Sequence, residues 1–189
     1  MSGEENHLIL DALIEKGASF AICRLSGEQT DRFVMQTGGS PARLHDFEAL
    51  NGQQGFVIAP FRITATSPLL VIRPDRTDLP QLSDLRALPV PEHTAAAIPG
   101  GATGPASSGK MNYRKRFYQF MQPLQSGELE KVVLSRCKSV PRRKGFSPGR
   151  TFYRAAKKYE RSCAYLFHTP VSGTWIGSSP EILLTGLEN

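Results

Sequence analysis

The feature that most constrains this fold is the stretch of residues 76–109, where proline, glycine and small polar residues largely replace bulky apolar ones. Proline offers no backbone N–H and glycine loses much entropy on ordering, so neither sustains a helix or a strand. The few large apolar side chains here cannot offset the entropy of ordering the chain. We therefore predict a mobile linker over residues 76–110, between a variable N-terminal region (residues 1–75) and a second domain (residues 111–189).

The N-terminal region has the pattern of one helix followed by a hairpin. Acidic residues just after Ser2 suit the positive end of a helix dipole, and Gly17 suits the end of that helix. Two runs rich in apolar and β-forming residues, 20–24 and 33–36, flank a turn that contains Gly27. This arrangement predicts two antiparallel strands.

Three further segments complete the N-terminal region. Residues 41–50 predict a short helix, and residues 55–61 and 69–73 predict two more strands. The first third of the chain should therefore consist mostly of antiparallel strands behind one helix.

The second domain begins with a predicted amphipathic helix. Asn112 is a good N-cap, and we expect the aromatic stripe formed by Tyr113, Phe117 and Phe120 to pack into a core. A strand over residues 132–140 should follow this helix directly.

A second helix and a hairpin come next. Residues 148–160 predict the helix, and residues 163–168 and 174–178 predict the two strands of the hairpin. Pro180 then interrupts the chain before a further strand at residues 181–184. Taken together, the segments predict an α+β fold with a largely antiparallel sheet and flanking helices.

Composition narrows the class of protein. The three cysteines are widely spaced and odd in number, which argues against a disulfide framework or a zinc site and favours a reducing, cytoplasmic setting. No signal peptide or membrane-length apolar run is present. The formal charge of +6 leaves nucleic acid, an anionic membrane or an acidic small molecule open as partners.

Lys131 stands where the charged end of a helix meets Val132 and Val133. In a strand it would share a face with Val133 and oppose Glu130, so Glu130 is not its ion-pair partner. A partly desolvated amine here would have a pKa lowered from about 10.4, as a general base requires. Taken alone, the residue fits better the simpler interpretation that its amine reaches water.

Glu181 follows Pro180 and precedes another apolar run. Gly177 and two serines just before it would let the backbone approach another group closely. In a cleft this carboxyl could keep its proton and act as a general acid. Taken alone, it also fits a surface glutamate at the end of a strand.

The residue patterns of these two stretches together resemble those of one family. S-G-E-L-E-K-V-V-L-S-R follows the amphipathic helix, and W-I-G-S-S-P-E-I-L-L follows about forty-five residues later. Together they resemble the chorismate-binding enzymes, and within them the isochorismate synthases of menaquinone and siderophore biosynthesis. The resemblance covers residues 112–184, whereas residues 1–73 share only a general layout with the family.

The resemblance implies a fold, a substrate and a reaction. The fold would be part of an α/β sandwich whose cleft binds chorismate, a small molecule, with Mg²⁺ holding a substrate carboxylate. Lys131 would be the general base that activates water, and Glu181 the general acid that protonates the departing hydroxyl. The resemblance implies a monomeric enzyme with neither nucleic acid nor membrane as partner.

Two alternatives and one expectation about completeness remain. A salicylate synthase shares the lysine, and a non-catalytic module could bind a partner through the Arg and Lys clusters of the second half. The family's Mg²⁺ ligands lie C-terminal to the second motif, so we expect a truncated N-terminal portion that is itself inactive and lacks those ligands.

Overall fold

The computed structural model describes residues 3–88, 110–133 and 140–181. The chain divides into two compact units, one formed by Met1–Ile98 with Ser147–Asn189 and the other by Pro99–Phe146. Helices and two antiparallel sheets make up the described part, which confirms the predicted α+β class. The division into N-terminal region, linker and second domain stays a prediction.

Helix α1 (Gly3–Glu15) opens the first unit, as the sequence predicts. Its buried face carries Ile9, Leu10 and Leu13, which are spaced to lie on one side of a helix. Gly17 adopts a positive φ of 71°, and the N–H of Ala18 donates to the carbonyl of Leu13 (3.0 Å). This closing turn ends α1 where glycine can take the left-handed conformation.

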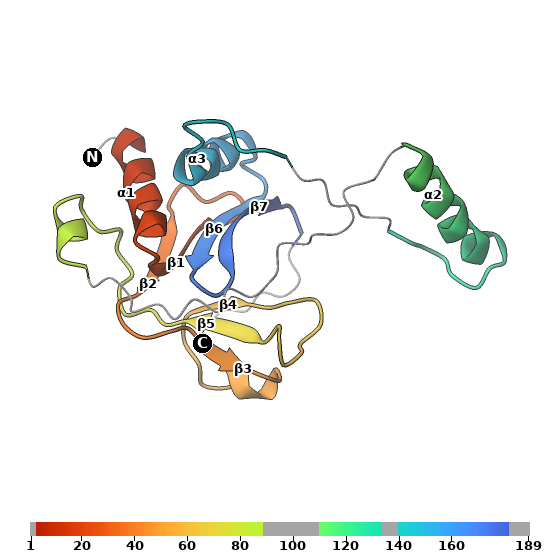
Figure 1. Ribbon diagram of the computed structural model, residues 1–189, viewed down its shortest axis with the longest axis horizontal. Helices are drawn as coiled ribbons and strands as arrows, with labels where there is room; N and C mark the ends of the chain where they lie inside the picture. The colour runs from red at the N-terminus through yellow and green to blue at the C-terminus, as the bar shows by residue number, and fades with distance from the viewer. Residues whose placement is uncertain (1–2, 89–109, 134–139, 182–189) are drawn as a thin grey trace. The chain divides into compact units, whose positions relative to one another are not determined.

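A four-stranded antiparallel sheet forms the centre of this unit (Figure 1). The strand order is β2-β1-β6-β7, which places the two hairpins side by side. Both predicted hairpins are thereby confirmed. The strands are β1 (Ser19–Arg24), β2 (Arg32–Gln36), β6 (Cys163–Thr169) and β7 (Gly173–Ser179).

Two helices cover one face of this sheet, α1 and the predicted helix α3 (Pro148–Lys158). The N–H of Arg150 donates to Ser147 Oγ (2.9 Å), so Ser147 caps the start of α3. Phe152 and Phe20 are fully buried between the helices and the sheet, with Leu166 beside them. This layer is the main hydrophobic core.

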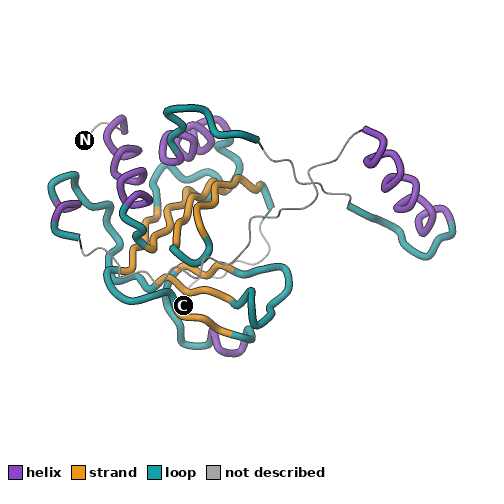
Figure 2. Tube along the Cα trace, in the orientation of Figure 1, coloured by secondary structure: helices purple, strands orange, loops and turns teal. Residues whose placement is uncertain are grey.

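A second, three-stranded sheet packs near the opposite face (Figure 2). Its order is β3-β5-β4, and the central strand β5 is buried along its whole length. Ile72 of this sheet contacts Ala21 and Phe167 of the four-stranded sheet in a smaller core. The strands are β3 (Ala42–Leu44), β4 (Phe56–Ile58) and β5 (Leu69–Ile72).

The prediction of a short helix over residues 41–50 is largely wrong. Residues Ala42–Leu44 form β3, which pairs with β5, and only Glu48–Leu50 form a single 3₁₀ turn. Asp46 accepts the N–H of Ala49 (2.8 Å) and so favours this turn over a longer helix. Pairing with the buried strand β5 overrides the local helical tendency.

The beginning of the predicted linker packs against the first unit. Arg76 exchanges two backbone hydrogen bonds with Met35 (2.8 and 3.0 Å), and its side chain forms ion pairs with Asp78 and Asp84. Leu85, in the 3₁₀ turn Asp84–Arg86, is buried in the main core. Residues 89–109 lie outside the described part of the chain.

Helix α2 (Lys110–Gln125) belongs to the second unit. It begins at Lys110, two residues before the predicted cap Asn112. Tyr113 and Phe117 stack with ring centroids 6.4 Å apart, yet both rings are exposed, as is Phe120. The expectation that this stripe packs into a core is therefore not met within its own unit.

Candidate active site

The turn between β6 and β7 fixes how these two strands align. Thr169 is fully buried, and its Oγ1 accepts the N–H of Ser172 (2.8 Å). The indole Nε1 of Trp175 donates to the carbonyl of Ser172 (2.8 Å), and Gly173 adopts a positive φ of 70°. These contacts set the register in which Phe167 lies opposite Trp175.

Aromatic rings line the face of β6 and β7 that points away from the helices. Phe167 stacks on Trp175 across the strands (6.2 Å between centroids) and on Tyr165 along its own strand (6.1 Å). The ring of Phe56, in the second sheet, lies with its centroid 5.7 Å from that of Phe167. These separations lie in the range that favours aromatic pairs, so the rings support one another.

Gly177, in the second motif, lies directly opposite Tyr165. A Cβ placed at position 177 would overlap the Cζ and Oη atoms of Tyr165. The sequence predicts a close approach of backbone to another group here. The group is the tyrosine ring of the neighbouring strand, and only glycine leaves room for it.

Glu181 stands two residues beyond the end of β7. Its N–H donates to Ser179 Oγ (3.2 Å), across Pro180, and its side chain is exposed. Glu181 itself is not in a strand, and the rest of the strand predicted at residues 181–184 lies outside the described residues. The structure thus places the candidate acid just beyond the end of β7.

Lys131 lies in the second unit, after helix α2. Gly127 adopts a positive φ of 73°, and the N–H of Leu129 donates to the carbonyl of Pro123 (3.0 Å), which turns the chain back. The side chain of Lys131 is exposed. The desolvated surroundings predicted for this amine are therefore not found within its unit.

The strand predicted at residues 132–140 is not observed where the structure can test it. Residues 131–133 have no regular structure, and residues 134–139 are outside the described part. Lys131 and Glu181 fall in different units, so their pairing in one site stays a prediction. In the described ranges neither residue forms an ion pair.

No metal-binding set is found in the described residues. Across residues 3–88, 110–133 and 140–181, no group of three or more His, Cys, Asp or Glu side chains could hold a metal ion. A site for Mg²⁺ is therefore not identified in these ranges, and we derive no reaction step through one. Magnesium stays an expectation of the family resemblance.

Two thiols and one phenol near the first hairpin have perturbed acidity. Burial, with the nearby Cys163, raises the pKa of Cys23 to about 11. Burial also raises the pKa of Cys163, and that of Tyr153 to about 12. Both cysteines are free thiols. All three groups are protonated at neutral pH, so none is suited to act as a nucleophile.

The described helices are too short or too polar to cross a membrane: within those ranges none combines the length and the apolarity of a span. The cytoplasmic location stays a prediction from the sequence.

Comparison with known proteins identifies the family. The model of a family described as chorismate binding enzyme matches residues 83–189. This match covers more than half of the 189 residues, so the chain belongs to the chorismate binding enzyme family. The predicted resemblance is confirmed, and both Lys131 and Glu181 lie in the matched region. No curated protein and no solved structure matches the chain.

Membership of this family makes the protein a chorismate-utilising enzyme with a small-molecule substrate. The alternative of a non-catalytic basic module is correspondingly disfavoured. Family membership does not specify the particular reaction, which we infer below from the chemistry of the two motifs.

Proposed function

We propose that the protein is an isochorismate synthase, which converts chorismate to isochorismate. The observation that carries this proposal is that one family match spans both motifs, with a lysine at position 131 and a glutamate at position 181. Relatives that use ammonia in place of water need no base to activate their nucleophile. A lysine at this position therefore supports water as the nucleophile.

The reaction requires one base and one acid. Neutral Lys131 removes a proton from water while the water oxygen bonds to C2 of the ring. The ring double bonds shift, the C4–O bond breaks, and protonated Glu181 gives its proton to the leaving hydroxyl. One water enters and one leaves, so the net change is an isomerisation. Proton transfer from Lys131 to Glu181 afterwards restores both groups.

Both roles require a protonation state that is uncommon in water. A lysine must lose its charge and a glutamate must keep its proton near neutral pH, and desolvation favours both changes. The two side chains are exposed in their own units. The proposal therefore requires that substrate binding, or residues outside the unit that holds each side chain, remove water from them.

The test is to incubate the full-length protein with chorismate and identify the products, with and without added Mg²⁺. In water enriched in oxygen-18, the proposal predicts isochorismate that carries one labelled oxygen at C2. Unlabelled isochorismate would contradict water attack. Formation of pyruvate with salicylate would instead assign the protein to the salicylate synthases.

A further inference from the structure

Within the described residues, strand β7 lies at the edge of its sheet and has a glycine near its end. In the described part of the chain its neighbour is β6 alone, on one side. Gly177 lies inside this strand. Glycine has no side chain to pack and loses more backbone conformational entropy on ordering than other residues, so it weakens the strand at this position. An edge strand with an internal glycine is expected to be poorly fixed unless another group covers the glycine.

The ring of Tyr165 covers Gly177. Tyr165 lies opposite Gly177 in the β6–β7 register, and its Cζ and Oη occupy the position a Cβ at 177 would take. Phe167 stacks against the same ring with an interplanar angle of 15°. An aromatic side chain placed across from a glycine in this way replaces the missing packing and stabilises the strand pair.

The path of β7 determines where Glu181 stands. Ser179, the last residue of β7, lies on the same face as Gly177 and opposite Cys163. Its Oγ accepts the backbone N–H of Glu181 (3.2 Å). Pro180 between them has a fixed φ and adds little freedom. Any shift of β7 at Gly177 is therefore passed on to Glu181 within four residues.

We propose that Tyr165 is a positioning residue for Glu181, acting through its cover of Gly177 and the alignment of β7. Tyr165 is not assigned a contact with the reacting atoms. The effect on catalysis rests on the proposed function of Glu181, whereas the effect on β7 does not.

The experiment compares four variants of the full-length protein. Tyr165→Ala removes the ring, Tyr165→Phe keeps it, and Gly177→Ala forces a methyl group into its space. In the double variant, Tyr165→Ala with Gly177→Ala, the space left by the tyrosine ring accommodates that methyl group. Leu85→Ala serves as a control, because it opens a cavity in the main core beside helix α1 and leaves the Tyr165–Gly177 pair in place.

Two readouts are measured on each variant. Hydrogen exchange over residues 173–181 reports the order of β7 and the Glu181 turn without reference to activity. Steady-state kinetics on chorismate separate kcat from KM. Misplacing an acid by about 1 Å costs on the order of 100-fold in rate, so kcat should change far more than KM.

The expected result is faster exchange over residues 173–181 and a kcat about 100-fold lower in Tyr165→Ala and in Gly177→Ala. Tyr165→Phe should restore both values to near those of the wild type, and the double variant should be better than Gly177→Ala. Leu85→Ala should lower stability but leave kcat and the exchange of this segment close to normal.

Unchanged exchange of residues 173–181 in Tyr165→Ala would overturn the proposal, as would effects of the two substitutions that simply add. Faster exchange with a normal kcat would also overturn it, because Glu181 would then not depend on Tyr165. A wild-type protein that fails to convert chorismate would refute the proposed function instead, and the exchange measurements would still decide whether Tyr165 positions the Glu181 turn.

Discussion

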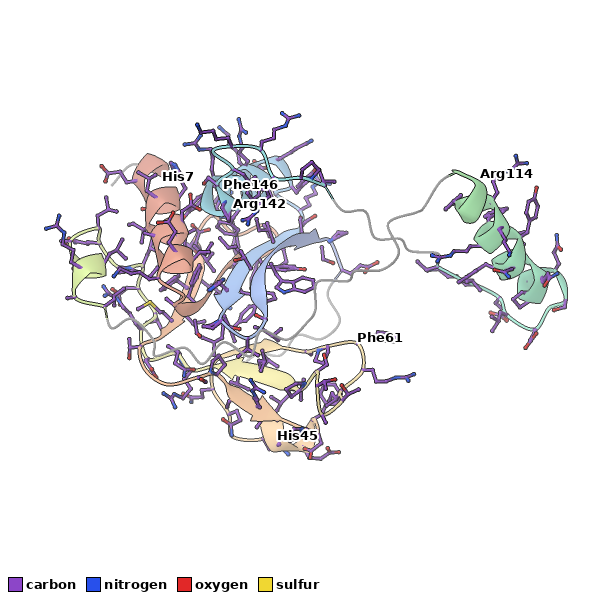
Figure 3. All side chains as sticks on the ribbon, viewed as in Figure 1. His7, His45, Phe61, Arg114, Arg142 and Phe146 are labelled. Carbon is purple, nitrogen blue, oxygen red and sulfur yellow. The ribbon has the colours of Figure 1, made fainter. Side chains whose placement is uncertain are left out.

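Asp11 of helix α1 caps the start of helix α3. Its Oδ1 accepts the N–H of Gly149 at 2.8 Å, although the two residues are 138 positions apart in the sequence. At the same point Gly149 lies against the backbone of His7, which Figure 3 labels on α1. The two helices that cover the sheet are thus joined by a carboxylate at a helix N-terminus, where the dipole favours negative charge.

Gly149→Ala should destabilise the protein. A Cβ at this position would meet the carbonyl oxygen of His7 at 2.5 Å and its Cα at 3.0 Å, so the helices must separate. Such overpacking costs about 1–3 kcal/mol in the free energy of unfolding, measurable by urea denaturation. Gly38→Ala is the matched control, because a Cβ there meets nothing within 4 Å, and it should be neutral or stabilise by up to about 1 kcal/mol. Equal effects at both positions would contradict the close helix contact.

Asp11→Ala should lower the free energy of unfolding by about 1 kcal/mol, because the N–H of Gly149 loses its acceptor. Asp11→Asn keeps an oxygen in place and should lose less. Measurements in low and high salt give a further check, because salt screens the charge of Asp11, whereas asparagine carries no charge to screen. If Asp11→Asn were as destabilising as Asp11→Ala, the role of this side chain as a cap would be wrong.

Leu85→Ala should reveal that the start of the predicted linker contributes to the core. Leu85 is 6% exposed and packs in the main core, so its truncation should cost about 3 kcal/mol. Leu82, three residues earlier, is 46% exposed, and Leu82→Ala should cost less than about 0.5 kcal/mol. Thermal or urea unfolding of the two variants measures the difference. Two small and equal losses would show that this segment is not packed.

Stability should fall as the pH rises from about 9 to about 11. Burial raises the pKa of Cys23 from 9.0 to about 11, so in this range the unfolded state loses the thiol proton and the folded state keeps it. The unfolded state then binds fewer protons, and the slope of stability against pH is negative. Below pH 9 the thiol is protonated in both states and has no effect.

The measurement for Cys23 is the melting temperature between about pH 8 and about pH 10.5. Cys23→Ser should lose less stability over this range than the wild type, because a serine hydroxyl does not titrate. Tyr153, whose pKa is also raised, contributes equally to both proteins and cancels in the comparison. Parallel curves for the two proteins would show that the surroundings of Cys23 do not raise the pKa of its thiol.

The elements with a clear periodic pattern could be predicted from the sequence. Helix α1 and helix α3 have apolar residues at helical spacing, and the two hairpins have a glycine in or beside each turn. Strand β3 could not be predicted, because its three residues become a strand only by pairing with β5. The packing of Leu85 was also missed, although Leu79, Leu82, Leu85 and Leu88 recur at every third residue, because the flanking prolines limit this segment to one short 3₁₀ turn.

The candidate site could also be predicted only in part from the sequence. The sequences of the two motifs indicate Lys131 and Glu181 as candidate residues. Local sequence patterns do not show whether other parts of the chain remove water from either side chain. Tyr165 was missed, although a signal existed. Once the hairpin turn is placed at residues 170–173, antiparallel register puts position 165 opposite position 177, an aromatic residue facing a glycine.

The central claim is that Lys131 and Glu181 are the base and the acid of one reaction. The most direct test measures kcat for isochorismate formation, together with chorismate binding, in Lys131→Ala and Glu181→Gln variants of the full-length protein. Loss of a general base or a general acid costs typically about 10²–10⁴-fold in rate. The account predicts a loss of this size in each variant, with chorismate still bound. Normal isochorismate production by either variant would contradict it.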